Sequence, residues 1–338
     1  MLRMVYCIWK WPIGHWGELD HRVKLRSHRV NEELNLRYGF IGLGNLGKHL
    51  AANLARGGFD LGVFDLQRGA ADAALAAGAE WMNSIPELAR TCDCLITCLP
   101  SPAATAQVLD QALPAMRQGS SWIEMSTNDF AEIEILAARA LALGIGTLAC
   151  PVTGGVHRAQ AGEITVLVGG PAPLYETHKP ALQAMGGRVI HLGGIEQAAV
   201  TKVVTNMLAF IHLIAAGEAL MLCAKAGVDL RAAFEAIAAS SGTSFVHETE
   251  SQVILNGSYD IGFTMDLACK DAGFALEFGR RFGVPLRLAG VMEQTFIEGR
   301  AKYGGAAWSS MIVKLLEDSV GTPLRAPGFP ARLDPDVV

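Results

Sequence analysis

Short apolar runs alternate with longer amphipathic segments along the chain from residue 38 to residue 150. The apolar runs are four to six residues long, which is typical of buried strands. The amphipathic segments have the period and length of helices. Strands are predicted at residues 61–64, 94–99, 121–125, 147–150 and 163–168, and helices at residues 46–56, from residue 84 onward and at residues 126–143. Repeated strand–helix units of this length predict a parallel, doubly wound sheet of the α/β class.

An apolar segment without proline runs from residue 195 to residue 225 and predicts one long helix. Because it is apolar nearly all round, we expect it to be buried. A membrane-spanning helix needs roughly 18 consecutive uncharged residues. The segment has no uninterrupted stretch of that length, because it contains Lys202, His212 and Glu218, so no membrane partner is expected. Lys202 and Asn206 share a face, where Lys202 either reaches the surface along its stem or has a functional role. Further helices at residues 229–240, 266–282 and 288–300, without strands, indicate an all-helical domain.

Composition and charge exclude several classes of protein. The chain has 338 residues, of which 51% are hydrophobic and 18% charged, so it can fill two cores. A net charge of −5 gives no basic surface, and no nucleic-acid partner is expected. Seven cysteines, without an apparent secretory signal, favour reduced thiols in a cytoplasmic protein. Cys94 and Cys98 lie in an apolar run without metal-ligand spacing, so we interpret them as core residues and expect no metal site.

A glycine motif opens the strand–helix region. Gly42, Gly44 and Gly47 have the G-x-G-x-x-G spacing between a predicted strand and a predicted helix. That spacing allows a tight turn, close approach to a pyrophosphate and close packing of helix on strand. Asp65 ends the second strand 23 residues after Gly42, near the distance expected of an acid that binds the adenosine ribose. The combined pattern predicts a Rossmann-type dinucleotide-binding domain rather than a simple glycine-rich turn.

The chain divides into four parts by pattern and composition. Residues 1–37 are rich in basic residues and tryptophan without any periodicity, and we interpret them as a disordered extension outside the fold. Residues 38–194 form the dinucleotide-binding domain, and residues 195–322 an all-helical domain entered through the long helix, which the resemblance given below implies serves substrate binding and oligomerisation. Residues 323–338 are rich in proline and arginine, and we expect a loose tail.

Several candidate site residues follow predicted strands. Leu99 and Pro100, Ser126 and Thr127, and residues 151–155 all lie where ligands bind in doubly wound sheets, beyond the carboxyl ends of the strands. This convergence predicts a site at that edge.

Thr153, Gly154 and Gly155 form a separate candidate anion site. Two glycines allow backbone N–H groups to turn toward an anion, and the threonine hydroxyl adds a donor. A plain turn before the next strand is the alternative interpretation.

Taken together, the motifs resemble those of the β-hydroxyacid dehydrogenases, the family of 3-hydroxyisobutyrate dehydrogenase and tartronate semialdehyde reductase. The likeness extends from about residue 38 to about residue 317, and it is carried by residues 40–47, 151–155 and 201–206 and by the Lys270–Asp271 pair. It implies a Rossmann-type domain followed by an all-α domain, and a homodimer or homotetramer packed through the helical domains.

The resemblance also implies a role for each motif. Lys202 would be the catalytic acid/base and Asn206 a catalytic and substrate-binding residue. A small carboxylate substrate would be held by Thr153, Gly154, Gly155, Asn206 and Lys270. The cofactor would contact Gly42, Leu43, Gly44, Asn45, Leu46, Gly47, Asp65, Leu99, Pro100, Thr127 and Lys270.

The sequence departs from the family pattern at a few positions. Arg158, preceded by His157, replaces a usual glycine, Trp308 replaces a common aspartate and Ala104 replaces a frequent asparagine. Arg158 next to an anion site suggests a substrate with a second anionic or larger polar group. The alternative is that Arg158 is an ordinary surface residue.

These observations predict an oxidoreductase that transfers a hydride between nicotinamide and a short-chain 3-hydroxy acid or its semialdehyde. Asp65 favours NAD over NADP, because a carboxylate repels a 2′-phosphate, and Arg68 nearby softens that preference. An imine reductase of the same fold and a catalytically silent NAD-binding sensor are the alternatives. Lys202 counts against both.

Overall fold

The computed structural model describes residues 36–333. Most of the predicted extension at residues 1–37 lies outside this range, as do the last five residues of the predicted tail. Arg37, which we placed in the extension, begins the first strand instead, and its backbone N–H donates to Asp93 Oδ2.

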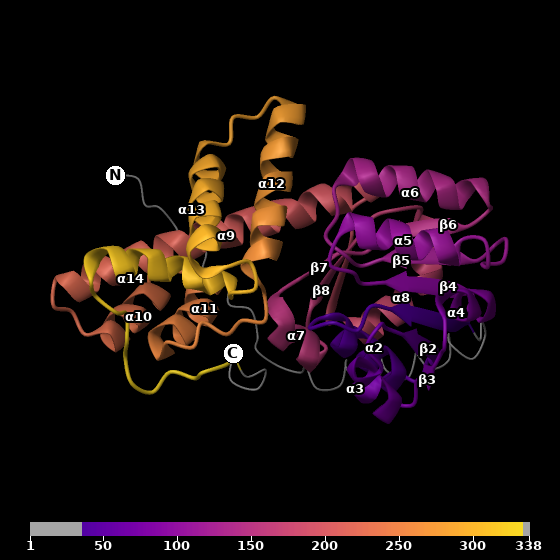
Figure 1. Ribbon diagram of the computed structural model, residues 1–338, viewed down its shortest axis with the longest axis horizontal. Helices are drawn as coiled ribbons and strands as arrows, with labels where there is room; N and C mark the ends of the chain where they lie inside the picture. Colours follow the sequence, from indigo (N-terminus) through magenta and orange to yellow (C-terminus); the bar gives the residue numbers. More distant parts are fainter. Residues whose placement is uncertain (1–35, 334–338) are drawn as a thin grey trace, which may run out of the picture. The chain divides into compact units, whose positions relative to one another are not determined.

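Six parallel strands form the main sheet, in the order β3-β2-β1-β4-β5-β6 (Figure 1). The strands are β1 (Arg37–Ile41), β2 (Asp60–Phe64), β3 (Glu80–Trp81), β4 (Cys94–Thr97), β5 (Ser121–Glu124) and β6 (Gly146–Ala149). The connecting segments are α2 (Gly47–Arg56), the 3₁₀ turn η1 (Arg68–Ala71), α3 (Asp72–Ala76), α4 (Ile85–Thr91), α5 (Pro102–Ala112) and α6 (Phe130–Ala142). The order reverses between β1 and β4, which is where such sheets bind ligands.

Helices cover both faces of this sheet. One core contains Leu50 and Leu54 of α2, and the other contains residues of α4, α5 and α6. Cys94 is fully buried in the first core, as predicted, and Cys98 is partly buried and packs against the same core. The chain is thus a doubly wound α/β fold, as the alternation of strand-like and helix-like segments predicts.

Side-chain caps fix where several helices begin. Ser84 accepts a hydrogen bond from the backbone N–H of Glu87 at the start of α4, as predicted. The prediction that a helix begins at residue 126 is wrong, because the hydroxyl of Ser126 already accepts the N–H of Leu99. Asp129 caps α6 instead.

A second, three-stranded sheet follows the first, in the order β7-β8-β9. Its elements are β7 (Val152–Thr153), α7 (Gly155–Ala161), β8 (Thr165–Val168), α8 (Ala172–Met185) and β9 (Arg188–His191). The short strands β7 and β9 were not predicted from the sequence. Reciprocal backbone hydrogen bonds between Ala149 and Gly169 join this sheet to the end of β6.

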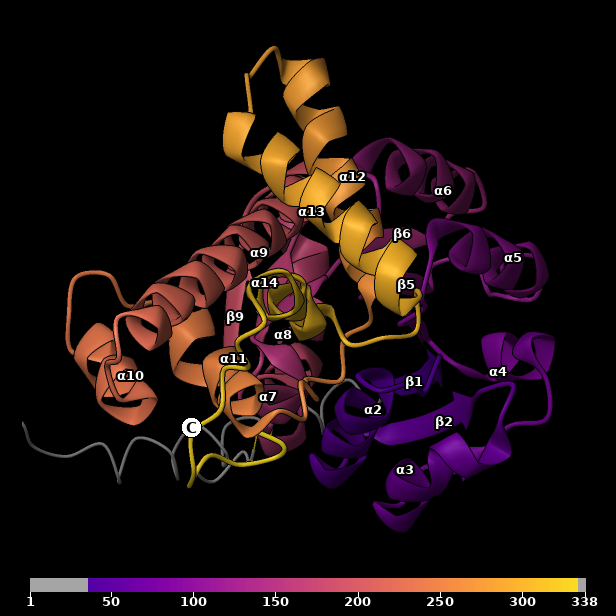
Figure 2. The same ribbon diagram turned by 60° about the vertical axis from the view of Figure 1, so that its left-hand side comes forward.

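Helices make up the rest of the described chain (Figure 2). They are α9 (Ile195–Lys225), α10 (Leu230–Ala238), α11 (Phe245–Asn256), α12 (Met265–Phe282), α13 (Arg287–Tyr303), the 3₁₀ turn η2 (Ser309–Val313) and α14 (Lys314–Val320). The amino-terminal part of α9 packs in the core with α4 to α6, through Ala198, Ala199 and Val203. Its later residues, such as Phe210 and Leu220, belong to the separate core of the helical domain. One helix therefore joins the two domains.

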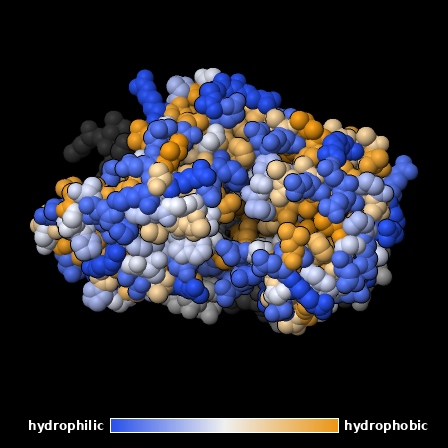
Figure 3. Space-filling view, viewed as in Figure 1, coloured by the Kyte–Doolittle hydropathy of each residue, from blue (hydrophilic) through white to orange (hydrophobic). Residues whose placement is uncertain are grey.

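The expectation that α9 is buried on all sides is wrong. Val204, Leu208 and Leu222 are 41%, 46% and 72% exposed, with the exposed Glu218 between the last two. Apolar side chains also reach the surface elsewhere, interspersed with hydrophilic ones (Figure 3). Among the described helices α9 alone is long and apolar enough to cross a membrane, and a third of its most apolar stretch is buried.

The tail from residue 323 is not loose where the structure describes it. Leu324 is fully buried, and the backbone N–H of Ala326 donates to the Leu255 carbonyl. The Arg325 guanidinium donates to Glu317 and to the Tyr259 hydroxyl. The arginine content of the tail suggested that it is solvated, but Arg325 anchors the tail through these two acceptors.

A buried histidine joins α8 to the main sheet. His178 is 2% exposed, and its ring nitrogens lie 3.1 Å from the Tyr38 hydroxyl on β1 and 2.7 Å from the Ser121 hydroxyl on β5. Burial lowers the pKa of His178 from 6.5 to about 4. The folded protein therefore holds this ring neutral over a pH range in which the unfolded chain protonates it.

His178 should make the protein sensitive to mild acid. Below pH 6.5 the unfolded chain binds a proton that the folded ring takes up only near pH 4, so stability falls over that interval. We expect the free energy of unfolding to drop by about 1 to 3 kcal/mol more in the wild type than in His178→Asn between neutral pH and pH 4. Urea unfolding at several pH values measures the difference, and parallel pH profiles would contradict it.

Candidate active site at the carboxyl edge of the sheet

The glycine loop after β1 has the shape that a dinucleotide requires. Gly42 has a φ of +96°, and a Cβ there would collide with the Cys98 carbonyl. A Cβ on Gly47, the first residue of α2, would collide with the Gly42 carbonyl, whereas Gly44 faces open space. The first and third glycines thus allow the turn and the helix packing, and the second leaves room for a pyrophosphate at the amino end of α2.

Asp65 follows β2 directly and is linked to this loop. Its Oδ2 accepts the backbone N–H of Leu43 at 2.7 Å, and its Oδ1 accepts that of Gln67 at 2.9 Å. Asn45, in the same loop, donates to the Gly262 carbonyl in the segment between α11 and α12. The predicted cofactor residues Gly42 to Gly47 and Asp65 therefore lie together at one end of β1 and β2.

Lys202 and Asn206 form a hydrogen-bonded chain with the Lys270–Asp271 pair. Lys202 Nζ donates to Asn206 Oδ1 at 2.7 Å, one turn along α9. Asn206 Nδ2 donates to Asp271 Oδ2 on α12 at 2.6 Å. Lys270 Nζ lies 2.8 Å from Asp271 Oδ1 and 2.9 Å from the carbonyl oxygen of Thr127, in the loop after β5. Residues of α9, α12 and the sheet edge, far apart in sequence, thus meet.

The charge state of Lys202 follows from this environment. Lys202 is 9% exposed, and burial lowers its pKa from 10.5 to about 8. The Asp271 carboxylate acts in the opposite direction, and the Lys270 ammonium lowers the pKa further. Both protonation states of the amine are consequently accessible near neutral pH. This excludes the interpretation that Lys202 extends into solvent.

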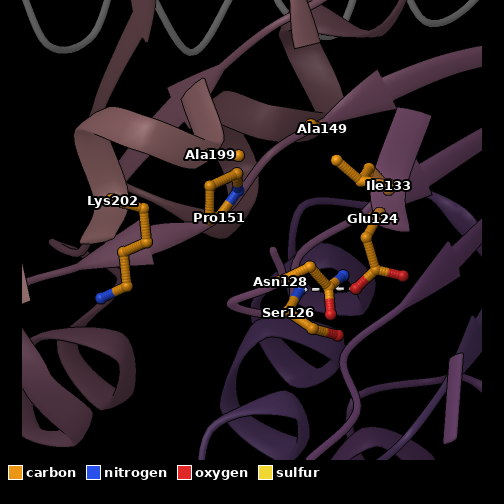
Figure 4. Close-up of a pocket in the computed structure, with 8 residues that line it drawn as sticks. All are labelled: Glu124, Ser126, Asn128, Ile133, Ala149, Pro151, Ala199 and Lys202. Atoms are coloured by element: carbon orange, nitrogen blue, oxygen red, sulfur yellow. Dashed lines mark hydrogen bonds between the residues drawn. The ribbon is translucent and has the colours of Figure 1, made fainter. Parts of the chain in front are cut away.

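A small cavity separates Lys202 from a buried polar cluster. Glu124, Ser126 and Asn128 line one side of it and Lys202 the other (Figure 4). Pro151, which directly precedes β7, lines it between them. The cavity therefore lies at the carboxyl edge of the main sheet, beside α9.

Glu124 organises the loops on the far side of that cavity. Its carboxyl group accepts the Thr97 hydroxyl and the backbone N–H of Ser126. Ser126 in turn accepts the N–H of Leu99, so the loop containing Leu99 and Pro100 is tied to the one containing Thr127. Burial raises the pKa of Glu124 to about 7, although the hydrogen bonds from Ser126 and Thr97 lower it. Glu124 and Ser126 thereby fix the two loops predicted to contact nicotinamide.

Sequence reasoning missed part of this cluster. Glu124 and Asn128 were not among the predicted site residues, and Asn128 has both amide atoms buried without a hydrogen-bond partner in the described chain. Their position after β5 was the available signal, because polar residues there face the ligand side of the sheet.

The predicted carboxylate segment lies next to this cavity. Thr153 ends β7, and Gly154 and Gly155 have φ values of +125° and +88°, which favour glycine. Within residues 36–333, this segment makes no hydrogen bond to Lys202. The segment is joined to the cavity through Pro151, two residues before Thr153.

Asp271 should matter more for stability than its single charge suggests. It is 1% exposed and accepts hydrogen bonds from two partners, so Asp271→Ala leaves the half-buried Asn206 amide without its acceptor and the Lys270 ammonium without its counter-charge. We expect a loss of about 3 kcal/mol in the free energy of unfolding. Asp110, which pairs with Arg139 on the surface, is the control: Asp110→Ala should cost less than about 1 kcal/mol. Equal losses in urea unfolding would refute the prediction.

Comparison with known proteins agrees with the two-domain arrangement. Residues 37–193 match the family model described as the NAD binding domain of 6-phosphogluconate dehydrogenase. Residues 197–316 match the family model described as the NAD-binding domain of NADP-dependent 3-hydroxyisobutyrate dehydrogenase. The two matches meet near the start of α9.

The alignments with individual relatives extend over nearly the whole length of each relative. 2-(Hydroxymethyl)glutarate dehydrogenase of Eubacterium barkeri is 32% identical over 86% of this chain and 97% of its own length. The structure of a 3-hydroxyisobutyrate dehydrogenase from Salmonella typhimurium is 29% identical, with a TM-score of 0.78 over 83% of this chain and 99% of that one. An imine reductase from Pseudomonas sp. shares the fold, at 19% identity and a TM-score of 0.57 over 83% and 99% of the two chains. The chain therefore belongs to the β-hydroxyacid dehydrogenase family and is an NAD(P)-dependent oxidoreductase.

Proposed function

We propose that the protein reversibly transfers a hydride between NAD and a short-chain 3-hydroxy acid or its semialdehyde, with Lys202 as acid/base. The observation that carries this proposal is the buried Lys202 at the cavity, hydrogen-bonded to Asn206 and with a pKa lowered to about 8. An amine that exchanges its proton near neutral pH suits an alcohol–carbonyl interconversion.

Lys202 transfers the proton in both the reduction and the oxidation. When bound, the nicotinamide ring supplies or accepts the hydride. In reduction the Lys202 ammonium donates a proton to the carbonyl oxygen of the semialdehyde. In oxidation the neutral amine accepts the proton of the alcohol. Asn206 keeps the amine oriented, because its Oδ1 accepts from Nζ while its Nδ2 is held by Asp271.

The substrate carboxylate is assigned to Thr153, Gly154 and Gly155. Positive φ values at both glycines keep side chains away from the backbone N–H groups of this segment, which leaves room for an anion. Lys270, held by Asp271 and the Thr127 carbonyl, adds a positive charge at the same edge of the sheet. These residues would fix the substrate with its C3 oxygen toward Lys202.

Oligomerisation through the helical domain is part of the proposal. The exposed apolar side chains of Val204, Leu208 and Leu222 on α9 support a homodimer or homotetramer, since a partner subunit that covers them removes apolar surface from water.

The two alternatives are less favoured. The likeness to imine reductases extends to the fold alone, and a sensor without catalysis has no need of a buried lysine hydrogen-bonded to Asn206. A lysine costs free energy in such a place unless it is paired or used.

Replacing Lys202 should abolish most turnover without loss of cofactor. We expect Lys202→Met to lower kcat about 10²- to 10⁴-fold. Because Lys202 is assigned to the substrate and not to the glycine loop, the NAD dissociation constant measured by calorimetry should stay within about twofold, well below 1 kcal/mol. Lys225→Met, at the exposed end of the same helix, should behave as the wild type. Near-normal turnover in Lys202→Met would contradict the assignment of Lys202 as the acid/base.

The pH profile of the wild type provides the second half of this test. Oxidation requires the neutral amine, so its kcat/KM should rise with pH through about 8. Reduction requires the ammonium, so its kcat/KM should fall over the same interval. Profiles with the opposite slopes would assign the proton transfer to another group.

Asp65 should select NAD over NADP. Its carboxylate stands at the end of β2, tied to the loop through Leu43, where it suits ribose hydroxyls and repels a 2′-phosphate. Arg68 lies over the Trp81 ring, with no ion pair to Asp65 among the described side chains, and softens the preference. We expect a higher kcat/KM with NAD, and a ratio lowered by about tenfold or more in Asp65→Ser, a change of about 1.4 kcal/mol. An NADP-favouring wild type would overturn this.

A further inference from the structure

Arg158, on α7, carries a positive charge that the described protein leaves unpaired. Its guanidinium carbon lies 4.6 Å from the centroid of the Phe245 ring, at the start of α11. Its guanidinium makes no hydrogen bond or ion pair with another residue between 36 and 333. Stacking on a ring uses the flat face of a guanidinium and leaves the N–H groups at its rim available. Arg158 is therefore held in position but not neutralised.

Its stem places Arg158 against the segment assigned to the substrate carboxylate. A Cβ built on Gly154 would lie 3.2 Å from Arg158 Cδ, in tight contact. Arg158 Cδ, one bond from the guanidinium, therefore lies over the open side of Gly154, where any larger residue would place its Cβ. Phe245 is 41% exposed, so a solute can reach the ring and the cation stacked on it.

A second polar group in the same cluster also has no partner. His157 is 8% exposed, and its buried Nε2 has no hydrogen bond within the described chain. Its ring stands against Gly155, with Cε1 3.0 Å from a Cβ built there, and stacks on Phe245 with planes 17° apart. Burial, and then the charge of Arg158, lower the pKa of His157. A neutral imidazole and an unpaired guanidinium thus flank Phe245 next to the carboxylate segment.

We propose that Arg158 binds a second carboxylate of the substrate, so that the substrate is a 3-hydroxy dicarboxylic acid. This inference rests on the proposed function, because the first carboxylate and the C3 hydroxyl must be held by Thr153, Gly154, Gly155 and Lys202. The second carboxylate then extends toward α11, where the guanidinium pairs with both of its oxygens. A neutral side chain in that direction gains no such pair.

Two probes differ in the group that Arg158 would recognise. In 2-(hydroxymethyl)glutarate, the carbon that bears the hydroxymethyl group and the first carboxylate also carries a second carboxylate on two methylene groups. In 3-hydroxyisobutyrate the same carbon carries a methyl group instead. The ratio of their affinities therefore reports the second-carboxylate contact, and a general disturbance of the site lowers both affinities and leaves the ratio unchanged.

The experiment measures both probes with the full chain in the presence of NAD, by calorimetry for binding and by cofactor absorbance for kcat and KM. We expect the wild type to prefer the dicarboxylate. Arg158→Gln should reduce that preference about 10- to 100-fold, through KM rather than kcat. Arg158→Lys, which keeps the charge but not the paired donors, should fall between the two. Arg188→Gln, an equal charge change on the exposed start of β9, should retain the wild-type ratio.

The outcomes separate this inference from the proposed function. A wild type without preference for the dicarboxylate, or a ratio that Arg158→Gln leaves unchanged, overturns the inference even if 3-hydroxyisobutyrate is turned over. A binding preference that depends on Arg158, without oxidation of either probe, supports the second-carboxylate site and overturns the proposed hydride transfer.

Discussion

The buried carboxylate of Asp271 is the contact on which the arrangement of the site depends. One oxygen accepts from Asn206 on α9, and the other from Lys270, which also donates to the Thr127 carbonyl beyond β5. Two helices of one domain and a loop of the other are thereby joined through a single side chain that water does not reach. Because a buried charge is costly unless each oxygen is satisfied, the relative positions of these elements are narrowly constrained.

Elements with strong local signals could be predicted from the sequence. The glycine spacing at Gly42 and Gly47 reflects contacts with neighbouring backbone that exclude a Cβ, so the pattern carries its own structural reason. The alternation of apolar runs predicted the main parallel sheet, and the i, i+4 spacing predicted that Lys202 and Asn206 share a face, where the structure shows them hydrogen-bonded. The contacts of Gly47 with Gly42 and of Lys202 with Asn206 lie within a few residues, and the sheet follows from strand periodicity.

Features that depend on distant contacts could not be predicted. Serine is a residue type that often caps helices, but the hydroxyl of Ser126 accepts the N–H of Leu99 in the loop after β4. The tail from residue 323 has a polar, proline-rich composition, yet Arg325 is anchored by Glu317 and Tyr259. The exposed apolar residues of α9 cannot be told from its buried ones by residue type, because the sequence does not show which side of the helix other elements cover.

The balance of charges around Lys202 has a consequence for reversibility. A lysine buried without a nearby anion would be largely neutral and a poor proton donor, whereas one in direct contact with a carboxylate would remain an ammonium. Here Asn206 lies between Lys202 and Asp271, so the anion acts from a distance and the nearby Lys270 ammonium partly offsets it. The resulting pKa of about 8 keeps both forms populated near neutral pH. An amide between the lysine and the carboxylate therefore suits a lysine that must donate a proton in the reduction and accept one in the oxidation.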